Sequence, residues 1–308
     1  MKKRVVLSAI WYPLCMASYF REALEQRDDI ELITIGLFTG DWIPWNGGMH
    51  LPSKYVKPPT IPIYSQTINY PFIISPILYQ NTYIDLLSDI DLFLGIDAGS
   101  YFYPKPKARI VAYVATDPHV LNYDRQREIA DYFFCMQTPY MKSGDYYLPY
   151  AYSPRIHYPM DLPKEYDACL IGLHYQQRDE LVQLLRTNGL KVFYDIGQVY
   201  DEYRAINNKS KIGLNWSSLL DMNARVWELA AMKLCSIENT VPDMQKFFKP
   251  EKDYLPFTDK YTAFQQVQRA LRDESLRMDI ANSAYETVKP HTYDARIEQI
   301  FNTVKLNG

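Results

Sequence analysis

The sequence contains few cysteines and few glycines, and its cysteines and histidines lack the spacing of metal ligands. The four cysteines, Cys15, Cys135, Cys169 and Cys235, lie far apart, with no C-x-x-C pair and no histidine at zinc-site spacing. A chain of 308 residues buries about three quarters of its unfolded surface, so it needs neither disulfides nor a structural metal to fold. We therefore expect four free thiols, a reducing compartment such as the cytoplasm, and no bound metal.

Several nucleotide-binding and hydrolase motifs are also absent. There is no G-x-G-x-x-G and no G-x-x-x-x-G-K-[ST], which argues against a standard NAD-binding unit and against a P-loop NTPase. The lack of H-E-x-x-H and G-x-S-x-G argues against a zincin and an α/β-hydrolase. No run of 18 apolar residues occurs, so the sequence predicts no membrane span. Residues 4–10 are predicted to form a strand rather than part of a signal peptide, because Trp11, Tyr12 and Pro13 interrupt the apolar stretch.

The charge balance lowers the expectation of a nucleic-acid partner. The chain has 33 Lys and Arg against 36 Asp and Glu, a net charge of -3, whereas proteins that bind nucleic acid usually show a basic footprint. Hydrophobic residues make up 47% and charged residues 22% of the sequence, which is ordinary globular usage and excludes a disordered or fibrous chain. The 27 tyrosines are an excess of stiff, amphipathic contact residues.

Apolar strand patterns alternate with amphipathic helix patterns along both halves of the chain. The expected strands are 4–10, 31–38, 91–97, 108–117, 132–136 and 145–151, then 166–173, 190–197, 211–216 and 235–239. The expected helices of the second half are 178–189, 201–209, 223–234, 261–273, 274–291 and 292–304, with a short one at 244–248. Residues 40–80 show no clear period and are predicted to form a long loop with short helices. The alternation predicts an α/β fold with two doubly wound parallel sheets, joined through the proline-rich segment 151–164.

Blocks of the second half carry a resemblance to a known family. They are LPYAYSPRIHYP (148–159), EYDACLIGLHYQQRDELVQLL (165–185), NNKSKIGLNW (207–216), NARVWELAAMKLCSIENTVPDMQKFF (223–248) and PHTYDARIEQI (290–300). In this order and spacing the blocks resemble the spore-maturation-protein-type glycosyltransferases, a branch of the group 1, family 4-like enzymes. In the first half only VAYVATDPHVL (111–121) is similar, to an Asp-x-Pro loop of the family.

The resemblance implies a GT-B fold, in which two Rossmann-like domains face one cleft. Residues 1–155 would form the acceptor-binding domain, residues 156–290 the nucleotide-sugar-binding domain, and residues 291–308 a helix that crosses back to the first domain. It also implies transfer of a hexosyl or pentosyl group from a UDP-sugar, with retention of anomeric configuration, no metal and no tightly bound cofactor. Ligands of open α/β sheets bind at the carboxyl ends of the strands.

Three residues at the start of one predicted helix are the main candidates for donor binding. The resemblance implies that Glu228 binds the ribose, since a carboxylate can accept hydrogen bonds from both ribose hydroxyls. Arg225 lies one turn earlier, where an arginine and a helix N-terminus together suit a diphosphate. The alternative is an i,i+3 surface pair between these two side chains. Asn223 either caps the helix or contacts the donor.

Further donor contacts are expected on neighbouring loops. Related enzymes often place a second glutamate eight residues before the ribose-binding one, but Leu220 stands there, so the adjacent Asp221 becomes the candidate for the sugar hydroxyls. Arg178 either reaches the phosphates or begins a solvated helix. Asp195 and Gly197 follow a strand and either touch the base or form a simple turn.

The first half offers candidates for acceptor binding and catalysis. Asp117 and His119 follow a predicted strand, and either could orient the acceptor hydroxyl or transfer a proton. The alternative is that Asp117, which precedes a proline, simply starts a turn. Asp97 is a second catalytic candidate at the end of another strand. Trp11 and Tyr12 either stack on the acceptor, together with the aromatic-rich insert, or pack beneath the long loop.

The resemblance leaves the acceptor open among a glycan, a protein, a small molecule and a modified DNA base. A phage-type DNA-base glycosyltransferase, which would act in the host cytoplasm, is one alternative, although the net charge of -3 argues against DNA. A catalytically degenerate GT-B protein that binds a sugar or a partner is another, favoured by the missing glutamate at position 220. A sugar-nucleotide epimerase, which turns over its substrate without an acceptor, is a third.

Overall fold

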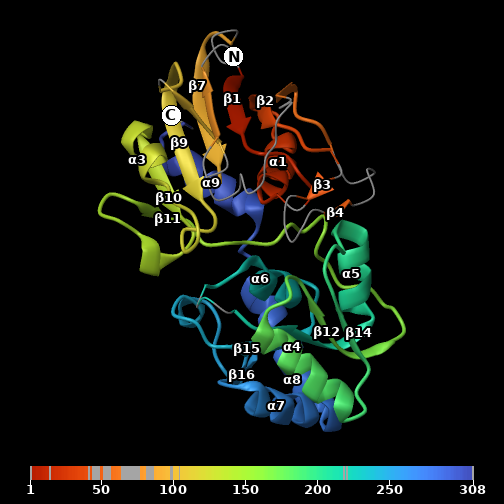
Figure 1. The fold of residues 1–308 in the computed structure, drawn as a ribbon. Helices are drawn as coiled ribbons and strands as arrows, with labels where there is room; N and C mark the ends of the chain where they lie inside the picture. Colours follow the sequence, from red (N-terminus) through yellow and green to blue (C-terminus); the bar gives the residue numbers. More distant parts are fainter. Residues whose placement is uncertain are drawn as a thin grey trace. The chain divides into compact units, whose positions relative to one another are not determined.

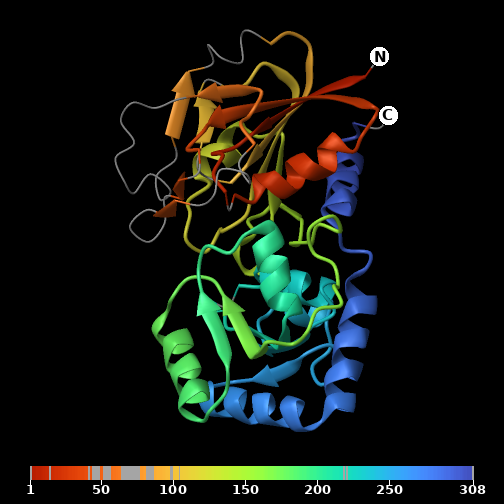
Figure 2. The ribbon, with the colours of Figure 1, turned by 90° about the vertical axis from the view of Figure 1, so that its right-hand side faces the viewer.

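The chain crosses twice between two units in the computed structural model, drawn in Figures 1 and 2. Unit 1 comprises residues 1–149 and 293–308, and unit 2 comprises residues 150–292. The structure describes residues 2–13, 15–40, 42–43, 49–50, 57–63, 77–80, 87–97, 100–103, 105–217, 219 and 221–306. No helix within these residues is long and apolar enough to cross a lipid bilayer.

Seven of the described strands of unit 1 form one parallel sheet in the order β11-β10-β9-β7-β1-β2-β5 (Figure 1). Their bounds are β1 (Lys3–Ser8), β2 (Ile30–Leu37), β5 (Ile61–Ile63), β7 (Ile90–Ile96), β9 (Ala108–Ala115), β10 (Tyr132–Cys135) and β11 (Tyr146–Tyr147). The central strands β7 and β9 are mostly apolar, and the middle of β1 is as well, as expected for strands covered on both faces. The strand predicted over 145–151 is shorter than expected, because only two residues of it pair with β10.

The part of residues 40–80 that the structure describes contains no helix, and most of the segment in which short helices were expected lies outside the described residues. That part contains short strands instead, namely β3 (Trp42–Ile43), β4 (Met49–His50), β5 and β6 (Ile77–Gln80). β3 pairs with β4, and β6 pairs with β8 (Ser100–Tyr103). β5 lies at the edge of the large sheet, where Pro62 is tolerated because an edge strand needs fewer backbone donors.

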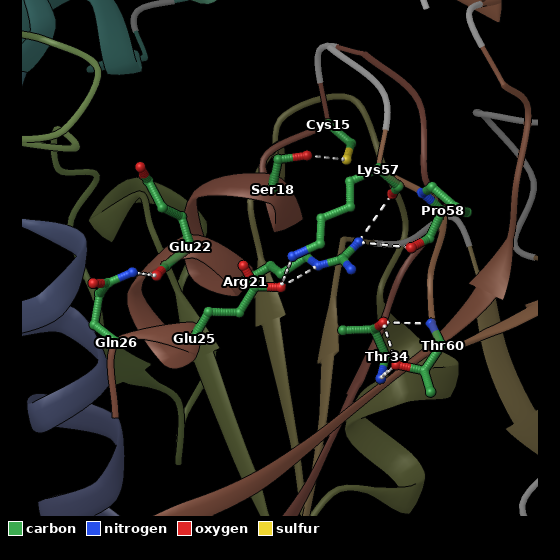
Figure 3. Close-up of polar contacts among 10 residues, drawn as sticks. All are labelled: Cys15, Ser18, Arg21, Glu22, Glu25, Gln26, Thr34, Lys57, Pro58 and Thr60. Carbon is green, nitrogen blue, oxygen red and sulfur yellow. Dashed lines mark hydrogen bonds and ion pairs between the residues drawn. The ribbon is translucent and has the colours of Figure 1, made fainter. Parts of the chain in front are cut away.

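Helix α1 (Ala17–Glu25) fixes residues 57–60 beside β2, as Figure 3 shows. The buried Arg21 donates from Nη1 to the carbonyl oxygens of Lys57 and Pro58, at 2.9 and 3.0 Å. The backbone N–H of Thr60 donates to Oγ1 of Thr34 at 2.7 Å. These bonds secure the segment that leads into β5.

Helix α9 (Tyr293–Thr303) is remote in sequence from the rest of unit 1 and packs against α1 (Figure 2). The ring of Tyr293 stacks on Tyr19 with 5.1 Å between ring centroids and meets Phe20 edge-on at 5.2 Å. The side chains of Ile297, Ile300 and Phe301 are fully buried. The last helix therefore supplies part of the hydrophobic core of unit 1.

Unit 2 contains a parallel sheet with the strand order β13-β12-β14-β15-β16 (Figure 1). Its strands are β12 (Tyr166–Ile171), β13 (Val192–Asp195), β14 (Ser210–Asn215), β15 (Cys235–Asn239) and β16 (Leu255–Phe257). Its helices are α4 (Gln176–Thr187), α5 (Tyr200–Asn208), α6 (Ala224–Ala231), α7 (Lys260–Arg272) and α8 (Glu274–Val288). The sequence analysis did not predict β16, and the short helix predicted at 244–248 is a 3₁₀ turn at Met244–Lys246.

Alternating side chains of β12 enter two different hydrophobic cores. Ala168 and Leu170 pack with apolar residues of α4, α7 and α8. Cys169 and Ile171 pack on the other face with residues of α5 and α6. The sheet is therefore covered on both faces, and polar side chains collect at the carboxyl ends of its strands.

Candidate functional site

Two arginine side chains meet at Gly172, directly after the carboxyl end of β12. Gly172 has a φ of +150°, and a Cβ atom there would lie 2.3 Å from Nη2 of Arg225 and 3.4 Å from Nη1 of Arg178. Both guanidinium groups therefore lie against the glycine backbone. Only a residue without a side chain leaves room for them in this conformation.

Arg178, in the first turn of α4, is 6% exposed and is held entirely by backbone carbonyls. Its Nε and Nη2 donate to the carbonyl of Trp216 at 2.9 and 2.7 Å, and its Nη1 donates to the carbonyl of Leu173 at 2.9 Å. Burial, together with the charge of Arg225, lowers the pKa of Arg178 to about 10, so the group is still cationic at neutral pH. Its burial excludes the alternative of a solvated helix start.

Arg225 lies in the first turn of α6, and Asn223 caps that helix. The Oδ1 atom of Asn223 accepts from the backbone N–H of Arg225 at 3.1 Å. Nη1 of Arg225 donates to Oδ1 of Asn215 at 3.1 Å, and its Nε is buried without a hydrogen-bond partner. Among the residues that the structure describes, no carboxylate lies within 4.0 Å of the guanidinium of Arg178 or Arg225.

Asn215 and Glu238 support this arrangement, and the sequence analysis did not single them out. They are direct neighbours at the ends of β14 and β15. Nδ2 of Asn215 donates to Oε2 of Glu238 at 3.1 Å, which turns Oδ1 of Asn215 toward Arg225 and toward Nδ2 of Asn223. Glu238 is 1% exposed, and burial raises the pKa of its carboxyl group. The sequence signal that could have identified this pair is an Asn and a Glu near the carboxyl ends of two buried strands.

Glu228 lies in the second turn of α6 and is 7% exposed. Its Oε2 accepts from the hydroxyl of Tyr203, on α5, at 2.7 Å. Its Oε1 lies 3.6 Å from Nε2 of His157, in the segment that enters unit 2. The alternative of a surface pair with Arg225 therefore does not hold. Tyr203 and His157 are further residues that the sequence analysis did not place in the site.

The remaining donor candidates lie on loops of unit 2. The carboxylate of Asp221 accepts from the hydroxyl of Ser217, which in turn accepts from the backbone N–H of Asp221 at 3.0 Å. Asp195 is exposed and ends β13, and its Oδ1 accepts from the next N–H of the chain at 2.7 Å. Its carbonyl accepts from the N–H of Gly172 at 3.0 Å, so this loop, which continues to Gly197, borders the arginine pair.

In unit 1 the structure brings two catalytic candidates together around Tyr123. Asp97 has a left-handed φ of +71° and accepts from the hydroxyl of Tyr123 at 3.1 Å. That hydroxyl accepts from the N–H of Thr116 at 3.2 Å, and Oγ1 of Thr116 donates to Asp117 at 3.2 Å. Burial, followed by the charges of Asp97 and Asp117, raises the pKa of Tyr123 well above its usual value. His119 lies in the turn that Asp117 starts.

The aromatic candidates Trp11 and Tyr12 are both buried in unit 1. Trp11 is 2% exposed, its Nε1 donates to the carbonyl of Ile35 at 2.9 Å, and the guanidinium of Arg21 lies over its ring. For Trp11 the structure therefore favours the packing alternative over stacking on an acceptor. Much of the insert 42–80, with which both rings were expected to form a groove, lies outside the described residues.

The polar edge of unit 2 combines groups that suit one kind of ligand. Two cationic guanidinium groups, which have no carboxylate partner within the described part of the chain, and the N-terminus of α6 can bind a polyanion. A buried carboxylate beside them can accept from neutral hydroxyl groups. The described residues contain no group of three His, Cys, Asp or Glu side chains that could hold a metal ion.

Comparisons with known proteins agree with this picture. Residues 162–302 match a family model described as glycosyl transferase-like. No curated protein sequence matches the chain. Among solved structures, the chain is similar to sucrose-phosphate synthase from Thermosynechococcus elongatus, with a TM-score of 0.61, 13% identity and coverage of 100% of both chains.

Two further solved structures are similar over nearly the whole chain. An alpha-glucosyltransferase in complex with UDP and a 13-mer DNA has a TM-score of 0.64 and 11% identity, covering 99% of this chain and 100% of that one. A glycosyltransferase from Rickettsia africae ESF-5 has a TM-score of 0.61 and 9% identity, covering 99% and 98%. At these identities the likeness concerns the fold alone, which is GT-B as predicted.

The chain has the GT-B fold, and its residues 162–302 are similar to glycosyl transferases, which agrees with the predicted enzyme class. The glycosyl transferase-like part is residues 162–302, which run from β12 to α9 and include the arginine pair and Glu228. The spore-maturation-protein type stays a prediction.

Proposed function

We propose that this protein transfers a hexosyl or pentosyl group from a UDP-sugar to an acceptor, retaining the anomeric configuration and using no metal. The observation that carries the proposal is the pair Arg178 and Arg225 at Gly172, which has no carboxylate partner among the described residues. UDP is favoured because solved neighbours of the same fold are described with UDP or UDP-glucose.

The diphosphate of the donor would bind the arginine pair and the N-terminus of α6. Arginine can give two parallel hydrogen bonds to phosphate oxygens, and the helix dipole adds favourable charge. The same groups would stabilise the negative charge that develops on the diphosphate as the bond to the sugar breaks. Two cations in this position can replace the divalent metal that other transferases use.

Glu228 would accept hydrogen bonds from the ribose hydroxyls, and the loop from Asp195 to Gly197 would contact the base. Asp221 is the candidate for the sugar hydroxyls. In unit 1, Asp117, Asp97 and His119 are the candidates for orienting the acceptor hydroxyl and accepting its proton. A group of this kind typically contributes 10²- to 10⁴-fold to the rate.

The acceptor class stays open among a glycan, a protein, a small molecule and a modified DNA base. Three similar solved structures are described with DNA, but the net charge of -3 offers little phosphate neutralisation. The four buried thiols, none of which forms a disulfide, support a cytoplasmic location, since such thiols persist in reducing compartments.

A thermal-shift experiment tests the donor site. The full chain is melted with UDP, GDP, ADP and their common sugars, with and without EDTA. A ligand at 100 times its dissociation constant adds about 2.7 kcal/mol of stability. We expect the largest shift with UDP or a UDP-sugar, unchanged by EDTA and reduced in Glu228→Gln and Arg225→Met.

Glu274→Gln is the matched control, because this carboxylate is exposed on α8 and should leave the shift intact. The absence of a shift with every nucleotide would contradict the proposal and favour a degenerate, non-catalytic protein. Conversion of a UDP-sugar to another UDP-sugar without an acceptor would identify an epimerase instead. Retention is read from the anomeric configuration of the product by NMR.

A further inference from the structure

The carboxylate of Glu228 accepts a hydrogen bond from Tyr203 of α5 at 2.7 Å and faces His157 of the entering segment at 3.6 Å. Among the described residues its only potentially cationic neighbour within 4.0 Å is His157. A buried carboxylate without strong partners is costly, so its contacts determine both its charge and its orientation. We infer that Tyr203 and His157 are positioning residues for donor binding, which fix Glu228 in the orientation that the ribose requires. This inference rests on the proposed function.

Tyr203 provides the first constraint. Its hydroxyl donates to Oε2 of Glu228 at 2.7 Å, and its ring packs in the core that contains Cys169, Ile171 and Leu229. Burial and the nearby charge of Glu228 raise the pKa of Tyr203 well above its usual value, so the phenol keeps its proton and remains a donor. Because the ring has little freedom in the core, the position of the hydroxyl, and hence of Oε2, is fixed.

His157 provides the second constraint. Its Nδ1 accepts from the backbone N–H of Ser153 at 3.2 Å, which assigns the proton of the neutral ring to Nε2. That Nε2–H faces Oε1 of Glu228 at 3.6 Å. The ring also meets Tyr203 edge-on, with 5.9 Å between centroids. One carboxylate oxygen is thus tied to α5 and the other faces the entering segment.

The charge of His157 should control how strongly His157 competes with the ribose hydroxyls for the carboxylate of Glu228. The groups that face it are Glu228 on α6, and Tyr203 and Arg204 on α5. Burial lowers the pKa of His157, Arg204 lowers it further, and Glu228 partly opposes both. The ring is therefore neutral at neutral pH. When the pH falls to this lowered pKa, the imidazolium that forms draws the carboxylate away from the ribose hydroxyls, so donor affinity should fall.

The test for Tyr203 is a double-mutant cycle read by calorimetric titration of the full chain with UDP. We expect Tyr203→Phe to weaken UDP binding by about tenfold, the size of one hydrogen bond to a charged group. In the Glu228→Gln background the same change should weaken binding less than twofold further. Tyr254→Phe is the matched control, since it removes the hydroxyl of another buried tyrosine of unit 2, which bonds Thr240.

Three results of this cycle are distinguishable. Wild-type affinity in Tyr203→Phe would overturn the inference. An equal loss with and without Glu228 would also overturn it, because Tyr203 would then act through the fold rather than through the carboxylate. Wild-type affinity in Glu228→Gln would contradict the proposed function itself. Melting temperatures of all variants show whether each is folded.

The test for His157 is the pH dependence of UDP affinity between pH 5 and pH 8. His157→Gln keeps an N–H donor near the position of Nε2 but cannot ionise. At pH 7.5 we expect the variant to bind UDP with an affinity within about threefold of that of wild type. Between pH 7.5 and pH 5 its UDP affinity should fall less than that of wild type, and the difference should be about the size of one hydrogen bond. The phosphate groups of UDP also titrate in this range, but their effect on affinity is the same for both proteins and cancels when the two pH profiles are compared. Parallel pH profiles would overturn the role of His157.

Discussion

At the scale of single residues, Gly172 illustrates how the backbone makes room for charge. Replacing it by alanine should push the guanidinium of Arg225 aside, because the new Cβ would lie 2.3 Å from Nη2 at the flexible end of that side chain. We expect Gly172→Ala to weaken UDP binding by about tenfold or more, as expected for the loss of a charge-assisted contact. It should also lower the melting temperature, because alanine is strained at this φ.

Gly189→Ala separates these two effects. Gly189 also has a positive φ, of +81°, but nothing lies within 4 Å of the position of its Cβ. This variant should lose stability and bind UDP normally. Calorimetric titration and thermal melts of both variants are the measurements. Equal UDP affinity in the two variants would contradict the role given to Gly172.

The four cysteines are all buried, and none of them forms a disulfide. Burial raises the pKa of Cys169 to about 11 and that of Cys235 to about 12. Because the thiolate is the reactive form, we expect none of the four to react with a thiol-specific reagent in the native protein at pH 8. All four should react in denaturant. Rapid labelling of the native protein, mapped by mass spectrometry, would contradict the burial described.

The sequence identified the candidates that share one local pattern and missed those that do not. Asn223, Arg225 and Glu228 lie within two turns of one helix, so a short motif is enough to find them. Tyr203 and His157 contact Glu228 across 25 and 71 residues of sequence. Such contacts depend on the sheet topology, which the sequence pattern defines only as an alternation of strands and helices.

At the scale of elements, the residue that follows the C-cap of α6 has an unfavourable backbone conformation. Lys233 has a φ of +57°, in the left-handed region where a side chain costs roughly 1–2 kcal/mol and glycine costs little. We expect Lys233→Gly to raise the free energy of unfolding by up to about 1 kcal/mol, since the flexibility of glycine in the unfolded chain offsets part of the gain. Urea denaturation measures the difference.

Lys233→Ala is the control for this change. It removes the long side chain but keeps the Cβ atom, so it should not stabilise the protein. A gain in stability in both variants would show that the lysine side chain, rather than the backbone conformation, is unfavourable. UDP affinity should be unchanged in both, because Lys233 lies at the opposite end of α6 from Arg225.

Strands and helices could be predicted from the sequence where a strong hydrophobic pattern coincides with burial. Strands β1, β7, β9, β12 and β14 are apolar runs bounded by polar residues or loops, and the sequence located each within a few residues. β16 was missed because three residues around Pro256 carry no period. In residues 40–80, prolines and aromatics obscure the pattern, and the short strands described there are defined by their pairing with distant segments.

At the scale of the whole molecule, unit 1 is discontinuous in sequence. Helix α9 supplies Ile297, Ile300 and Phe301 to its core, and each such side chain contributes roughly 1.5–3 kcal/mol when buried. Their sum is a large share of the 5–15 kcal/mol that typically stabilises a domain. We therefore expect a chain that ends at Thr292 to lose the native structure of unit 1.

Unit 2 should behave differently in that truncated chain. It is continuous from Tyr150 to Thr292 and has its own sheet and cores, so it should remain folded and still bind UDP. Hydrogen exchange read by mass spectrometry can follow the two units separately. Protection of β1 and β7 equal to that in the full chain would show that α9 is dispensable for unit 1.

The placement of α9 also has a consequence during synthesis. The ribosome makes every strand of the unit 1 sheet before it starts unit 2, yet the helix that covers α1 is made only after unit 2 is finished. Domains generally fold as they emerge, starting from the N-terminus. We therefore expect unit 2 to be able to fold before unit 1 completes its core, since the face of α1 that α9 covers stays exposed until the end of synthesis.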